Sequence, residues 1–210
     1  MKKLFTIAVF IGLIWSPTLA ISQYQEATNP YEKNPDTLEV SQLLAPLLIH
    51  DPLFDAHAFT DAIVLLEQVN SKFHGSPIND TLKTALRSYS YLQRKELKHY
   101  QHQATFSMTL RDKKYDCLTS TLLIALVFEQ LEITYQVIEF DYHVALLLEI
   151  NGHSHMIDAT DPLSGFLSNN DEIGKRIEFY SLADTKKQQA VVSHLQGPKI
   201  ISFQELMGLY

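Results

Sequence analysis

The 210-residue sequence has one cysteine, no excess of basic charge and no internal repeat, and each absence excludes a class of protein. A single cysteine cannot form an intramolecular disulfide. The net charge is −7, and the chain has no basic run, which argues against binding to nucleic acid or to an anionic membrane surface. No loop has the carboxylate spacing of a calcium site. The absence of repeats and low-complexity tracts favours one domain of ordinary size.

A short apolar run at the N-terminus is typical of a secretory signal peptide. Two lysines precede residues 4–15, which are apolar except at two positions, and small residues at 18 and 20 suit a cleavage site. We expect a signal peptide over 1–20, with a retained anchor as the alternative. No cysteine follows the run, which argues against a lipoprotein. Cleavage after Ala20 would change the net charge from −7 to −9 and place the protein in the periplasm or outside the cell.

The remainder is predicted to be a single domain over 37–210, preceded by an extended lead-in over 21–36. Residues 37–101 have helical periodicity. We expect a helix over 37–49 that is kinked at Pro46, a second that begins near Asp55, and a third that begins at Ser76-Pro77 after a stop at Gly75. Residues 102–115 are predicted to be irregular or extended.

The second half of the chain has the pattern of an antiparallel sheet. Strands are predicted over 133–140, 143–150 and 153–160, and Asn151-Gly152 is a strong signal for a two-residue hairpin turn. Residues 176–180 are rich in β-branched and aromatic side chains and are predicted to add a further strand. A short helix is expected over 202–209. The predicted fold class is therefore α+β.

The single cysteine, Cys117, lies where a polar segment meets an apolar one. Asp116 is a favourable N-cap, and residues 122–128 are apolar on all sides, as in a buried helix. Cys117 would then lie in the first turn, where unpaired backbone N–H groups and the helix dipole lower the pKa of a thiol. The charge of Asp116 would oppose this effect unless its carboxylate is occupied in capping.

Chain geometry is expected to bring His143 back to Cys117. A helix over 117–130 is about 20 Å long, and a strand over 133–140 is about 25 Å long. The link between them is short, so the strand should return along the helix. His143, which opens the next strand, would then lie near the start of the helix.

The hairpin register determines which residues share a face with His143. If Asn151-Gly152 forms a two-residue loop, residue 150 pairs with 153, and 145 lies opposite 158. Asp158 would then be on the same face as His143 and within reach of it. A slip of one residue would move Asp158 to the opposite face.

These three residues suit thiol catalysis. Cys117 would be the nucleophile, His143 the base that takes its proton, and Asp158 the group that orients the imidazole. The Cys117 backbone N–H would stabilise the oxyanion. The second donor stays open among Tyr115, Gln103 and Gln101.

Three segments, "YDCLTSTLLIALVFEQLEI", "YHVALLLEI" and "MIDATDP", resemble the core of the transglutaminase-like (papain-like) superfamily. The similarity is greatest to exported bacterial members with "DC" at the helix start and "TDP" after the aspartate. The resemblance implies a papain/transglutaminase-like catalytic core over 115–162, with Cys117, His143 and Asp158 in the family's catalytic positions. Two departures are the aliphatic residues after His143, where many members have an aromatic residue, and the lack of a glycine before residue 133.

We therefore expect a cysteine-dependent acyl-transfer enzyme, of the peptidase/amidase or protein-glutamine transferase type. It would act on a protein or peptide substrate, use no metal or organic cofactor, bind no nucleic acid and have no stable membrane insertion after signal cleavage. The sequence leaves its oligomeric state open. The alternative is a catalytically inactive binding or assembly module of the cell envelope, in which Cys117 is an inert buried residue.

Other polar clusters are weaker candidates. His153 and His155 could suggest metal ligands, but no third ligand can be placed and a solvated hairpin edge is favoured. His50-Asp51 and His57 could likewise suggest a metal, but a helix-end pair and a cap neighbour explain them better. Asp161 competes with Asp158 as the acid, although turn formation before Pro162 explains it better.

Overall fold

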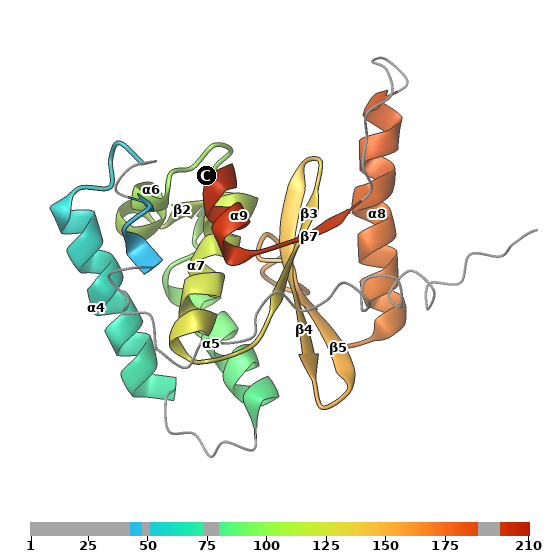
Figure 1. Ribbon diagram of the computed structural model, residues 1–210, viewed down its shortest axis with the longest axis horizontal. Helices are drawn as coiled ribbons and strands as arrows, with labels where there is room; N and C mark the ends of the chain where they lie inside the picture. Colours follow the sequence, from blue (N-terminus) through green and yellow to red (C-terminus); the bar gives the residue numbers. More distant parts are fainter. Residues whose placement is uncertain (1–42, 48–50, 74–79, 189–197) are drawn as a thin grey trace, which may run out of the picture.

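The computed structural model describes residues 43–47, 51–73, 80–188 and 198–210, and this part of the chain has an α+β fold, as predicted (Figure 1). Its helices are α4 (Ala56–Phe73), α5 (Thr81–Lys95), α6 (Phe106–Asp112), α7 (Cys117–Gln130), α8 (Asn170–Gln188) and α9 (Phe203–Leu209). Its strands are β1 (His99–Tyr100), β2 (Lys114–Tyr115), β3 (Gln136–Phe140), β4 (His143–Ile150), β5 (His153–Ile157), β6 (Phe166–Leu167) and β7 (Lys199–Ile201).

The main sheet has five antiparallel strands in the order β6-β5-β4-β3-β7. Helices α4, α5, α6, α7 and α9 lie on one side of it, and α8 lies on the other (Figure 1). Strands β1 and β2 form a separate parallel pair that holds Tyr100 opposite Tyr115, two residues before α7 begins. Of the described helices, none is both long and apolar enough to cross a bilayer.

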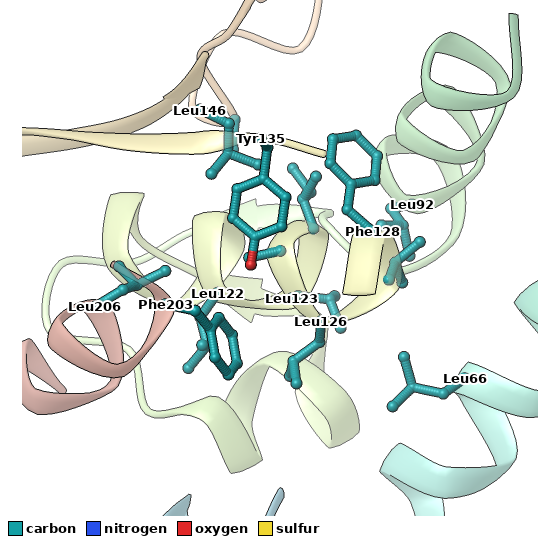
Figure 2. Packing of buried hydrophobic residues seen from close by; sticks show 14 of the residues in the cluster. Leu66, Leu92, Leu122, Leu123, Leu126, Phe128, Tyr135, Leu146, Phe203 and Leu206 are labelled. Carbon is teal, nitrogen blue, oxygen red and sulfur yellow. The ribbon is translucent and has the colours of Figure 1, made fainter. Parts of the chain in front are cut away.

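Helix α7 forms the centre of the larger core. Every residue from 119 to 128 is buried, which agrees with the predicted buried helix. Its apolar side chains meet α4, α5 and α9 on one side and β4 on the other (Figure 2). The contacting residues on those elements include Leu66, Leu92, Leu206 and Leu146. A helix that is apolar all round is stable only when it is enclosed in this way.

A smaller core lies between the sheet and α8. Ala145 and Met156 of the central strands pack against Ile173 and Ile177 of α8. Because side chains alternate along a strand, Val144, Leu146 and Leu148 belong to the α7 side. The two faces of β4 are thus both covered, which explains its almost continuous aliphatic sequence.

The hairpin turn and its register are as predicted. Asn151 and Gly152 have φ values of 55° and 76°, the left-handed conformations that a type I′ turn requires. Ile150 pairs with His153 and Leu147 with Met156. Strand β5 ends at Ile157, earlier than expected, because the next residues turn to form the loop described below.

Several helix predictions are also confirmed within the described residues. Helix α4 begins one residue after Asp55, and α9 follows an N-cap at Ser202. Helix α5 begins at Thr81, capped by Asp80, while the predicted start at Ser76-Pro77 lies outside the described residues. The signal peptide, the lead-in over 21–36, the stop at Gly75 and most of the 37–49 helix also lie outside them.

Two predictions are wrong. The 102–115 segment contains α6, which Thr105 caps at its N-terminus and which ends at Lys113 with a left-handed φ of 59°. Residues 176–180, predicted as a strand, lie within α8. Their β-branched and aromatic composition favours a strand locally, but Ile173 and Ile177 are spaced to pack one helical face on the sheet.

Candidate active site

The first turn of α7 holds Cys117 in a well-defined cap. The Asp116 carboxylate accepts a hydrogen bond from the Thr119 N–H at 2.9 Å, and the Thr119 hydroxyl accepts one from the Asp116 N–H at 3.0 Å. This reciprocal pairing satisfies two of the donors that a helix start leaves free. Cys117 is the first helical residue and is half-buried.

The Cys117 thiol lies against the start of β4. The backbone N–H of Val144 lies close enough to the sulfur to lower the pKa of the thiol, and one turn along α7 the Thr121 hydroxyl donates to the Val144 carbonyl at 3.3 Å. The helix start and the strand start are therefore side by side, as the expected chain path requires.

The electrostatics of Cys117 differ from the expectation. Burial raises the pKa of the Cys117 thiol, and the charge of Asp116 raises it further. The N–H groups of Val144, Leu118 and Cys117 lower it, but the net shift is upward. The expected lowering is therefore wrong, because burial of the thiol and the nearby charge of Asp116 outweigh the effect of the helix start.

His143 and Asp158 form a direct buried pair. The imidazole Nε2 lies 3.1 Å from Asp158 Oδ1, and both side chains are almost completely enclosed. Tyr180 of α8 stacks on the imidazole with the ring centroids 4.0 Å apart and an angle of 20° between the planes. Because Nε2 faces the carboxylate, Nδ1 is the nitrogen left to exchange a proton with another group.

The Asp158 carboxylate is held by four residues. Oδ1 also accepts from the Thr160 hydroxyl at 2.7 Å and the Thr160 N–H at 3.2 Å. Oδ2 accepts from Arg176 and from the Tyr180 hydroxyl, each at 2.6 Å. Burial would raise the pKa of Asp158, but its hydrogen bonds and the charge of His143 outweigh that effect and hold this pKa far below its usual range. Asp158 is thus a buried anion at neutral pH.

The loop that follows Asp158 is fixed from two sides. The Asp158 N–H donates to the Gly165 carbonyl at 2.8 Å, and Gln93 of α5 donates to the Ala159 carbonyl at 2.7 Å. A Cβ on Gly165 would lie 2.1 Å from the Asp158 carbonyl oxygen, so only glycine fits there. Asp161 forms turn hydrogen bonds to Ser164 and an ion pair with Arg176, which agrees with its predicted role in the turn.

The structure thus pairs His143 with Asp158 and places the helix start that carries Cys117 against the start of β4. His143 belongs to the α8 face of β4, whereas the thiol approaches from the α7 side and contacts the next residue, Val144. In the described part of the chain, no hydrogen bond joins the thiol to the imidazole.

No hydrogen bond joins any of the three candidates for a second oxyanion donor to the thiol in the described residues. Tyr115 is buried in the larger core, the Gln101 amide points to Met108 Sδ at 3.9 Å, and Gln103 is exposed. Tyr100 was not predicted, but it is near enough to Cys117 for the charge of that group to affect its pKa. Burial raises the pKa of the Tyr100 phenol, and the charges of Cys117 and Asp116 raise it further. Its ring packs edge-on against Tyr115 and is 57% exposed.

The remaining polar candidates make structural hydrogen bonds, and the surface position predicted for His155 is wrong, because its side chain is buried against Ser168. His155 Nδ1 pairs with the Ser168 hydroxyl at 2.9 Å, and Asp51 accepts from the Ser107 hydroxyl and N–H. Within the described ranges, no three His, Cys, Asp or Glu residues lie close enough to hold a metal ion.

Sequence reasoning missed Arg176, Tyr180 and Tyr100. The first two are spaced i and i+4, which places them together only if the segment is helical, and it was predicted as a strand. Tyr100 is placed by the pairing of two very short strands, which leave no periodic signal. In comparisons with known proteins, no family model, curated protein or solved structure matches the chain.

Proposed function

We propose that the protein is a cysteine-dependent acyl-transfer enzyme of the transglutaminase-like type, in which Cys117, His143 and Asp158 act together. The observation that carries the proposal is the buried His143–Asp158 pair, whose histidine directly precedes the residue that contacts the thiol. An orienting carboxylate and a histidine beside a cysteine at a helix start are the parts that thiol acyl transfer uses.

The chemistry starts from a neutral thiol. Because the pKa of Cys117 is raised, attack on an amide carbonyl needs His143 Nδ1 to take the thiol proton as the S–C bond forms. The resulting imidazolium is stabilised by Asp158 and then donates its proton to the leaving amine as the C–N bond breaks, which leaves a thioester. Water or a second amine attacks this thioester, loses a proton to Nδ1 and regenerates the thiol.

The developing oxyanion needs donors at the thiol. We assign the Cys117 backbone N–H, in the first turn of α7, as one of these donors. A protein or peptide amide is the substrate class. Water as acceptor gives a hydrolase and an amine gives a transferase; we slightly favour hydrolysis.

The second candidate is a binding or assembly module that has the fold without the reaction. The raised pKa of Cys117 and the lack of a hydrogen bond from its thiol to His143 in the described residues favour it. The two functions predict different behaviour of the thiol, which can be measured without knowing the substrate.

Alkylation of the single cysteine by iodoacetamide, followed by mass spectrometry from pH 5 to 10, separates them. Cys117 is the only thiol, so the adduct reports on the site alone. For the enzyme, we expect wild type to react at pH 7 about tenfold faster than His143→Ala, because proton transfer to His143 offsets the raised thiol pKa. In His143→Ala the rate should rise only above the ordinary thiol pKa of 9.0. Equal rates in the two proteins would support the binding module instead.

The acceptor can be determined with casein and a fluorescent amine. A transferase links the amine to casein, whereas a hydrolase releases ammonia or peptide fragments without incorporation. Cys117→Ala should abolish both signals and is the control for background reaction.

A further inference from the structure

Helix α8 contributes two polar side chains to the candidate site from the face opposite α7. Arg176 and Tyr180 are one helical turn apart. Ile173 and Ile177, on the same side of the helix, pack it against Ala145 and Met156 of the sheet. One face of α8 therefore makes both the apolar contacts with the sheet and the polar contacts with the candidate site.

Tyr180 contacts both members of the His143–Asp158 pair. Its ring stacks on the imidazole, and its hydroxyl donates to Asp158 Oδ2 at 2.6 Å. Burial raises the pKa of the Tyr180 phenol, and Asp158 raises it further, so the hydroxyl stays protonated and remains a donor at neutral pH.

Arg176 joins two carboxylates. One guanidinium nitrogen donates to Asp158 Oδ2 at 2.6 Å, and another donates to Asp161 Oδ2 at 2.9 Å. Asp161 lies in the turn that closes the loop after β5. Arg176 therefore ties the carboxylate to the loop that carries it.

We propose that Arg176 and Tyr180 are positioning residues, which fix the plane of the His143 ring and its tautomer by holding Asp158 Oδ2. With Oδ2 occupied by two donors, the carboxylate cannot rotate, and Oδ1 stays directed at His143 Nε2. A neutral imidazole that donates from Nε2 has an unprotonated Nδ1, which is the form a base requires. The catalytic role of this tautomer rests on the proposed function, whereas the tautomer itself is expected whether or not the protein is an enzyme.

A pocket of about 430 Å³ gives solvent access to Arg176. Its wall comes from α8 and from the segment around β6, and it includes Lys175 and Phe179. A small cation can therefore reach the position of the guanidinium once that side chain is removed, which makes chemical rescue a suitable test.

The first test reads the tautomer of His143 from its imidazole ¹⁵N chemical shifts. We expect wild type to have a single Nε2–H form, and we expect Arg176→Ala and Tyr180→Leu to have a mixture of both forms. Lys175→Ala removes the same charge one residue away, from an exposed position, and should match wild type.

The second test measures the rate of Cys117 alkylation by iodoacetamide at pH 7. We expect the alkylation rate to fall about tenfold in Arg176→Ala and Tyr180→Leu. Loss of a group that orients a metal-bound histidine has an effect of similar size. Millimolar guanidine should restore part of the rate in Arg176→Ala, while sodium chloride at equal ionic strength should not. Lys175→Ala should show neither the loss nor the rescue.

A single wild-type tautomer in folded Arg176→Ala and Tyr180→Leu would overturn the proposal and leave α8 a purely structural role. If these variants do not fold, Arg176→Lys and Tyr180→Phe keep the charge and the ring. The proposal requires a mixture of both imidazole forms in the ¹⁵N spectrum of each of them, and a single wild-type tautomer would overturn it. The ¹⁵N shifts need no reactive thiol, so an inert Cys117 would refute the proposed enzyme while the positioning of His143 is still measured.

Discussion

The two faces of the main sheet are covered in different ways. On the α7 face, five helices enclose a large core of aliphatic and aromatic side chains, with the buried carboxylate of Asp51 and several buried hydroxyl groups beside it. On the α8 face, one helix covers a small apolar cluster, and beside that cluster lie a buried carboxylate, a histidine, an arginine and a tyrosine. Most of the free energy of folding must therefore come from the α7 face, because it buries far more apolar surface.

The candidate site lies where these two faces meet. Cys117 approaches from the α7 face, His143 belongs to the α8 face, and the two converge on the first two residues of β4. The site therefore needs both layers. The α7 layer fixes the thiol by packing, while the α8 layer fixes the histidine by hydrogen bonds.

The largest effect on stability is expected for Leu126→Ala, in the centre of the α7 core. Leu126 is fully buried, so a cavity remains and the loss should be about 3 to 5 kcal/mol. Ile177→Ala on the α8 face should cost about 2 kcal/mol, because it lies in the smaller cluster, where neighbours can close in. Urea unfolding measures both losses from the midpoint, provided that the m-value is unchanged. Equal losses would contradict the difference between the faces.

Arg176→Ala is expected to cost about 3 kcal/mol at pH 7, because it leaves the buried Asp158 carboxylate without its cation. The matched test is a double-mutant cycle with Asp158→Asn. In that background the amide carries no charge, so the same arginine substitution should cost about 1 kcal/mol. A cost that is the same in both backgrounds would show that Arg176 stabilises the fold by packing alone.

The cost of Arg176→Ala should also depend on pH. Because the pKa of Asp158 is lowered in the folded protein, its contribution to stability is fully present above its ordinary pKa of 3.8. That contribution is lost as the pH falls from 3.8 toward the folded value. The unpaired carboxylate of the variant is protonated in the same range, so its deficit should shrink there. The deficit of Leu126→Ala should stay constant over this range, because no charge is involved.

The smallest effect on stability is expected for Asp116→Asn. Asparagine caps a helix about as well as aspartate, so the free energy of unfolding should change by less than about 1 kcal/mol. The charge of Asp116 raises the pKa of Cys117, so its removal should shift the alkylation profile to lower pH. Thr119→Val removes the hydroxyl half of the capping box without changing charge, and it should leave the profile in place. An unshifted profile in Asp116→Asn would show that solvent screens this charge.

Local signals made the start of α7 and the β4–β5 hairpin predictable. Asp116 and the apolar run after it specify a capped and buried helix, and Asn151-Gly152 specifies a turn with one register. From that register, the alternation of side chains along a strand was enough to place Asp158 on the face of His143. Each of these inferences relied on residues that are close in sequence or on the regular alternation of side chains along a strand.

The contribution of helix α8 could not be predicted in the same way. Residues 176–180 have strand-forming side chains, and their helical state depends on packing against Ala145 and Met156, which are distant in sequence. The raised pKa of Cys117 was also missed, because a sequence shows the helix start but not how deeply it is enclosed. The contacts between the helices and the sheet could therefore not be predicted from the sequence.

The two-residue turn at 151–152 has a consequence for how the chain can change in length. A one-residue slip in the strand pairing at this turn would exchange the two faces of β5, turn Asp158 away from His143 and leave the composition of the strand unaltered. An inserted or deleted residue should therefore be tolerated only where the loop absorbs it and the pair of Ile150 with His153 is kept. At this turn, the number of residues matters more for assembling the site than the identity of those residues.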